Sequence, residues 1–143
     1  GSEVANQIAR RMIVPPNREG GQAQFIAQPV PETTRDARIN NLIDYLQRNI
    51  SQPLNLDTLA ESVAMSRRTL TRHFMKATGM SVASWITAER LRRSQLLLES
   101  SNLPIEAVAE QVGYLSAVTL RQQFKARFGV SPAEWRKTFR MRS

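Results

Sequence analysis

Two stretches of the chain are near copies of each other and decide its fold. Residues 59–85 read LAESVAMSRRTLTRHFMKATGMSVASW, and residues 108–135 read VAEQVGYLSAVTLRQQFKARFGVSPAEW. They align at a period of about 50 residues once one extra residue near Leu115 is allowed for. We infer an internal duplication, because identical residues recur in order at Ala60/Ala109, Glu61/Glu110, Val63/Val112, Ser66/Ser116, Thr69/Thr119, Leu70/Leu120, Phe74/Phe124, Gly79/Gly129, Ser81/Ser131 and Trp85/Trp135.

Each copy has the plan of a helix-turn-helix unit. In the first copy a short helix is expected from Leu56 to Val63, and Ser66 then caps a second helix, 67–78, that Gly79 ends. A short helix, a turn of about three residues and a capped helix make up this motif. The second copy repeats it, with Pro104 starting a helix to Val112, Ser116 capping a helix to Phe128, and Gly129 ending that helix.

The rest of the chain predicts three further helices and a tail. An apolar stripe and a possible capping box at Thr33 predict a first helix over about 36–50, Ser81 caps a long helix to Ser100, and Pro132 begins a final helix. The prediction is an all-α domain of seven helices over residues 34–143. It comprises a first helix-turn-helix subdomain at 34–80, a linker helix at 81–100 and a second subdomain at 101–143. Residues 1–33 are predicted to be a tail with a possible helix at 4–13, followed by a Pro- and Gly-rich linker.

Composition indicates a polyanionic partner. The chain has 20 Lys and Arg against 12 Asp and Glu, for a net charge of +8, and the surplus lies beyond residue 33. The lack of cysteine and the single histidine argue against disulfides and zinc, and no apolar run is long enough for a membrane span or a secretion signal. We therefore predict a cytoplasmic protein with no metal, no cofactor and no catalytic residues.

The second helix of each copy has an outward face suited to DNA. In the first copy Leu70, Phe74 and Ala77 are expected to face the core, which turns Arg68, Thr71, Arg72 and Met75 outward. A helix of this width fits the major groove, where Arg reads guanine, Gln reads adenine, and Val or Thr methyl groups contact thymine. In the second copy the expected inward residues are Leu120 and Phe124, and the outward ones are Val118, Arg121, Gln122 and Lys125.

Simpler interpretations compete at several positions. Basic residues on a helix face can be merely solvated, although Arg68 and Arg72 fall at outward positions of a repeated motif. Trp85 and Trp135 follow an apolar period and are interpreted as core anchors, and His73 as a packing residue. For Arg90, Arg92 and Arg93 on the linker helix, packing at the core edge, surface solubility and phosphate contact all remain open.

The sequence resembles the AraC/XylS family of bacterial transcription regulators over roughly Arg35 to Phe139. The most specific matches are VAEQVGY at 108–114, Phe124-Lys125, Phe128-Gly129 and SPAEWR at 131–136. The resemblance implies two recognition helices in successive major-groove segments of promoter DNA, and regulation of transcription. It implies base contacts from Arg68, Thr71, Arg72, Val118, Arg121 and Gln122; for the DNA backbone we predict contacts from Ser66, Arg67, Lys76, Ser116 and Lys125.

Two positions depart from the family pattern. Leu120 stands where an aromatic residue is common, and Gln122 stands where Arg is frequent, which puts a guanine preference at the second half-site in doubt. Residues 4–25 also resemble the end of the DJ-1/PfpI-like domain found in one subgroup, and Gly1-Ser2 resembles a cloning remnant. The resemblance of residues 4–25 implies a missing N-terminal domain that senses a small-molecule effector and dimerises. We therefore expect the present fragment to be monomeric.

Three other functions remain as alternatives. A helix-turn-helix platform could serve mainly to contact protein such as RNA polymerase, which is also an expected partner of a DNA-bound regulator. Single-stranded nucleic-acid binding is disfavoured because the few aromatic residues occupy expected core positions. Enzymatic activity is disfavoured because no cysteine nucleophile, second histidine or facing pair of carboxylates emerges.

Overall fold

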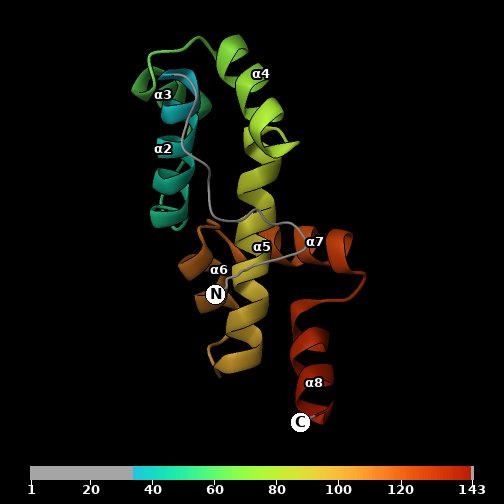
Figure 1. The fold of residues 1–143 in the computed structure, drawn as a ribbon. Helices are drawn as coiled ribbons and strands as arrows, with labels where there is room; N and C mark the ends of the chain where they lie inside the picture. Colours follow the sequence, from blue (N-terminus) through green and yellow to red (C-terminus); the bar gives the residue numbers. More distant parts are fainter. Residues whose placement is uncertain (1–33, 143) are drawn as a thin grey trace. The chain divides into compact units, whose positions relative to one another are not determined.

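The computed structural model describes residues 34–142, which form seven α-helices and no strand. The predicted all-α fold is therefore confirmed. The chain divides into two units between Asn40 and Asn41, within α2, and all contacts given below lie in the second unit. The helices are α2 (Thr34–Arg48), α3 (Leu56–Ser62), α4 (Arg67–Thr78), α5 (Val82–Ser100), α6 (Ile105–Val112), α7 (Ala117–Phe128) and α8 (Pro132–Arg142) (Figure 1).

Serine side chains cap the start of four helices: three of these caps were predicted, and Ser131 caps α8 by accepting from the Glu134 amide at 3.1 Å. Ser66, Ser81 and Ser116 each accept a hydrogen bond from the backbone amide three residues later, at 3.1, 3.1 and 3.4 Å. Such a bond satisfies one of the amides that a helix start otherwise leaves unpaired. The predicted bounds of α4 and α7 are confirmed, and Gly79 and Gly129 follow them in the left-handed conformation.

Helices α2, α3 and α6 differ from the prediction by one or two residues at one or both ends, whereas α5 ends at Ser100 as predicted. Helix α2 ends at Arg48, two residues before the predicted end, because the chain turns there and Gln52 donates to the Asn49 carbonyl at 2.9 Å. Ile50 is still buried, although it lies in the turn after the helix. Its place in the apolar pattern therefore correctly predicted burial but not helical backbone. Helix α6 begins at Ile105, after Pro104. The predictions at Thr33 and residues 4–13 lie outside the described residues, and the domain boundary at Thr34 stays a prediction.

The two copies of the repeat bury the same positions. From residue 69 to 85 and from 119 to 135 the pattern of buried, half-buried and exposed side chains is identical. Phe74 and Phe124 are fully buried at the two centres, and each meets the tryptophan of its copy edge-on, at centroid distances of 6.4 and 6.0 Å. The interpretation of both tryptophans as core anchors is confirmed.

One inward prediction is wrong and one is supported. Ala77 is exposed in the last turn of α4, as is its counterpart Arg127 in α7. In both helices the central phenylalanine is the last buried residue, and only the residue four positions later is half-buried. His73 is half-buried, in keeping with the packing role assigned to it. Within residues 34–142, no helix has the length and apolarity needed to cross a bilayer.

Helix α5 is the element against which both helix-turn-helix subdomains pack. It contacts α4 of the first copy and α6, α7 and α8 of the second, and Figure 1 shows it as the long central helix. At its C-terminal end, Trp135 donates to Glu99 at 3.0 Å and Arg136 donates to the Leu98 carbonyl at 3.1 Å. These bonds fix α8 against the end of α5.

A buried charge cluster lies midway along α5. The Glu89 carboxylate, with only 13% of its side chain exposed, accepts from Arg92 at 2.7 Å and from Arg93 at 2.8 Å. Burial works to raise the pKa of Glu89, but the two guanidinium groups outweigh it and hold that pKa below its ordinary value. Arg93 also donates to the Gln47 carbonyl at 2.7 Å, so the cluster ties α5 to the end of α2.

Candidate nucleic-acid interface

The outward faces of α4 and α7 are exposed as predicted. All six residues predicted to contact bases have exposed side chains: Arg68, Thr71 and Arg72 on α4, and Val118, Arg121 and Gln122 on α7. Helix geometry accounts for this placement. Burying the leucine and the phenylalanine of each helix turns away from the core the residue two positions before the leucine and the residues one and two positions beyond it. Each copy therefore presents one helix with polar and methyl-bearing groups toward solvent.

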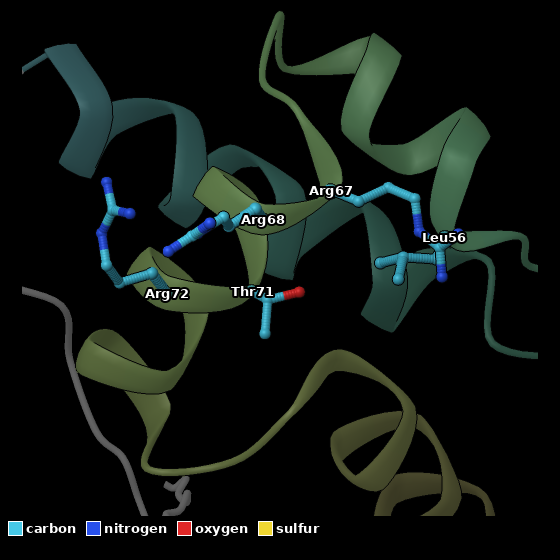
Figure 2. Close-up of a pocket in the computed structure, with 5 residues that line it drawn as sticks. All are labelled: Leu56, Arg67, Arg68, Thr71 and Arg72. Carbon is cyan, nitrogen blue, oxygen red and sulfur yellow. The ribbon is translucent and has the colours of Figure 1, made fainter.

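The face of α4 borders an open pocket. Its lining residues come from the start of α3 and from the first two turns of α4. Figure 2 shows Arg68 and Arg72 projecting to the same side of α4, whereas Arg67 extends toward Leu56 at the start of α3. The pocket is therefore rich in guanidinium groups, and it is lined by Leu56, Arg67, Arg68, Thr71 and Arg72.

The residues predicted to contact the DNA backbone are also exposed. Lys76 and Lys125 lie near the C-terminal ends of α4 and α7. They are not equivalent in the repeat, because Lys76 corresponds to Ala126 and Lys125 to Met75. The hydroxyl oxygens of Ser66 and Ser116 accept from the amides of Thr69 and Thr119, so these serines have a defined role as helix caps. Their contact with phosphate, like that of the basic side chains, stays a prediction.

Two ion pairs restrain arginines at the interface, and the sequence analysis missed both. Arg67 lies 3.2 Å from Asp57, and Arg121 lies 3.2 Å from Glu106. The two acids occupy equivalent positions, 49 residues apart, in the first turn of α3 and of α6. The period of the repeat could have identified them as a matched pair, but it could not have identified their partners, which are not equivalent.

Both ion pairs are open to solvent and are therefore weak. A hydrogen bond involving its own backbone and one from Arg121 hold the pKa of Glu106 below its ordinary value. Exposed pairs of this kind contribute little to stability, so a phosphate or a base can replace the carboxylate at small cost. The pairs therefore orient the two arginine side chains but leave them able to bind another partner.

Comparison with known proteins identifies the family. A family model described as a helix-turn-helix domain matches residues 59–138, which is more than half of the chain. The multiple antibiotic resistance protein MarA of Escherichia coli is 34% identical over 100 residues, covering 70% of this chain and 79% of MarA. The chain belongs to the AraC-type helix-turn-helix family. Domains of this family bind DNA to regulate transcription.

Two further relatives of this AraC-type domain extend the comparison. The transcriptional activator RhaR of Salmonella schwarzengrund is 26% identical over 94% of this chain, which spans 46% of RhaR. The DNA-binding domain of AdpA, a global transcriptional factor solved in complex with a target DNA, superposes with a TM-score of 0.71 at 32% identity, covering 73% of this chain and 95% of that one. The fold is thus one that a solved relative uses on DNA.

The second AraC-type copy has an apolar edge that the first lacks. Leu115, the extra residue in its turn, is fully exposed, and Val118 in the first turn of α7 is 59% exposed. Neither side chain contributes to the core, since Leu120 and Phe124 fill the inward positions of α7. Leu115 was not among the predicted site residues, although the sequence marks it as the one insertion in the repeat.

Proposed function

We propose that this AraC-type domain binds double-stranded promoter DNA sequence-specifically, with α4 and α7 lying in successive segments of the major groove. The observation that supports the proposal is the pair of equivalent outward faces. Each has an exposed set of side chains of the types that can read bases, on a helix whose start is fixed by a serine cap and whose opposite face is buried. Arg68, Thr71 and Arg72 would read one element, and Val118, Arg121 and Gln122 the other.

The linker helix gives the expected spacing of the two elements. Helix α5 has 19 residues. At 1.5 Å per residue its length is about 28 Å, which is comparable with one turn of DNA, roughly 34 Å. The proposal therefore predicts an asymmetric site, because α4 and α7 carry different side chains, with its two elements about 10 base pairs apart.

The proposal is tested by selecting bound duplexes from a randomised library at near-physiological salt and sequencing them. Two enriched elements about one helical turn apart are expected. Binding that is tight and salt-sensitive but enriches no sequence would contradict the proposal, because it would leave only the attraction between a basic protein and phosphate.

Replacing Arg72 by alanine is expected to relax the preference at one base pair and to weaken binding to the preferred duplex by about 1–3 kcal/mol. The physical reason is that an arginine in the major groove donates two hydrogen bonds to one base. Lys76→Ala is the matched control, since it removes the same charge from the same helix and is expected to weaken all sequences equally. Fluorescence anisotropy with single-base variants of the selected duplex measures both, and a uniform loss for Arg72→Ala would assign it to the backbone.

Further aspects of the proposal concern partners beyond DNA. We include contact with RNA polymerase as the means by which a bound regulator acts, and a small-molecule effector sensed by a DJ-1/PfpI-like domain preceding this one. The residues that suggest that domain, 4–25, lie outside the described part of the chain. We also propose that this fragment is monomeric and cytoplasmic, and that it binds DNA without catalysing a reaction.

A further inference from the structure

Three parts of the chain meet at one point beside the middle of α5. The first is the turn that follows α2, which presents the carbonyl groups of Ile50 and Gln52. The second is the Arg90 side chain, which donates from Nε to the Ile50 carbonyl at 3.0 Å and from a terminal nitrogen to the Gln52 carbonyl at 3.0 Å. The third is the turn between α6 and α7, which contains Gly113 and Tyr114. The first part belongs to the first subdomain and the third to the second.

The contact between the two turns is close enough to exclude a methyl group. A Cβ added to Gly113 would overlap the Ile50 carbonyl oxygen and would lie 2.7 Å from Arg90 Nε. Arg90 also stacks over Tyr114, with its guanidinium carbon 5.9 Å from the ring centroid. Ile50 and Tyr114 are both buried. One guanidinium group therefore connects the turn of the first subdomain to the turn of the second.

The chemistry of this group makes the connection rigid. A guanidinium is planar and donates in fixed directions, so two bonds to successive carbonyls leave it little freedom. Burial of Ile50 adds to the restraint, because its carbonyl would be left unpaired away from water if Arg90 moved. Arg92, two positions along α5, differs: it bonds Glu89 on its own helix and is 56% exposed.

We propose that Arg90 is a positioning residue that fixes the orientation of α4 relative to α7 and thereby sets the spacing of DNA elements that the domain accepts. The inference rests on the proposed two-element readout. Arg90 need not touch DNA in this role. It acts by holding the first subdomain against the turn that precedes α7, so that one separation of the two elements suits both helices.

The test compares Arg90→Met with Arg92→Met, which removes the same charge from the same helix but removes no bond to the backbone of the first subdomain, because Arg92 bonds Glu89 of α5. Affinity is measured for duplexes in which the two selected elements are moved apart in single base-pair steps, and for a duplex with one element. The wild type and Arg92→Met are expected to lose about 100-fold in affinity at the worst separation, because the second element then cannot be reached. For Arg90→Met the same loss is expected to shrink to about tenfold, with single-element affinity unchanged.

The outcomes separate the inference from the function on which it rests. A wild type that is indifferent to separation would overturn the two-element readout and this inference together. A wild type that prefers one separation, with Arg90→Met preferring it as strongly, would leave the readout standing and overturn the positioning role.

A second variant covers the case in which Arg90→Met does not unfold cooperatively. Arg90→Lys keeps the charge and can donate to one carbonyl, but it cannot form the two-pronged bond. Its preference for one separation is expected to weaken measurably, and an unchanged preference in this variant would also overturn the inference.

Discussion

Truncation of Phe124 to alanine is expected to lower the free energy of unfolding by about 3–5 kcal/mol. The side chain is fully buried at the centre of the second subdomain. Its ring centroid lies 4.6 Å from that of Phe128 and 6.0 Å from that of Trp135, which are themselves 5.7 Å apart. The cavity would therefore remove contacts from two aromatic neighbours at once, and packed rings add to the cost beyond the buried area.

The repeat supplies a matched comparison for this prediction. Phe74 is equally buried at the equivalent position, and its ring meets the ring of Trp85. The position of Phe128 is taken by Thr78, which is not aromatic and whose hydroxyl donates to the Phe74 carbonyl. Phe74→Ala is expected at the lower end of the range, about 3 kcal/mol. Urea unfolding followed by circular dichroism measures both variants. A smaller loss for Phe124→Ala than for Phe74→Ala would contradict the role given to the aromatic cluster.

Local signals in the sequence predicted most of the fold. The serine caps of α4, α5 and α7 act within three residues along the chain, so the residues that form each cap stand together in the sequence. The repeat then predicted equal burial in both copies. The predicted end of α2 was wrong because Ile50 is buried although it lies in a turn. Apolar spacing indicates which residues are buried but not which backbone conformation they adopt.

Contacts between distant residues could not be predicted in the same way. Arg90 and Arg93 donate to backbone carbonyl groups 38 to 46 positions earlier in the chain. Because every residue has a backbone carbonyl, the sequence gives no sign of which residue will accept these bonds. The sequence left packing, solubility and phosphate contact open for these arginines, and the structure shows two of them bonded to the backbone of the first subdomain. The outward residues of α4 and α7 were predictable because a helix with one buried stripe has only one opposite face.

Gly113→Ala is expected to lower the free energy of unfolding by about 2–5 kcal/mol, the sum of left-handed strain of about 1–2 kcal/mol and overpacking of about 1–3 kcal/mol. Gly113 has a φ of +104°, and the new Cβ would overlap the Ile50 carbonyl oxygen, which belongs to a buried backbone and has little room to move. The equivalent position in the first copy is Ala64, which tolerates a φ of +56°. Left-handed backbone alone therefore does not require glycine at this position of the repeat.

Two other glycines separate strain from overlap. Gly79 and Gly129 have φ values of +76° and +80°, and a Cβ added to either would meet nothing within 4 Å. Their alanine variants are expected to lose only the strain, about 1–2 kcal/mol. Thermal or urea unfolding of the three variants measures the difference. If Gly113→Ala is no less stable than the other two, the two turns are not in close contact, and the junction through Arg90 loses its main geometric support; if it is clearly less stable, the second turn needs glycine because the first subdomain lies against it.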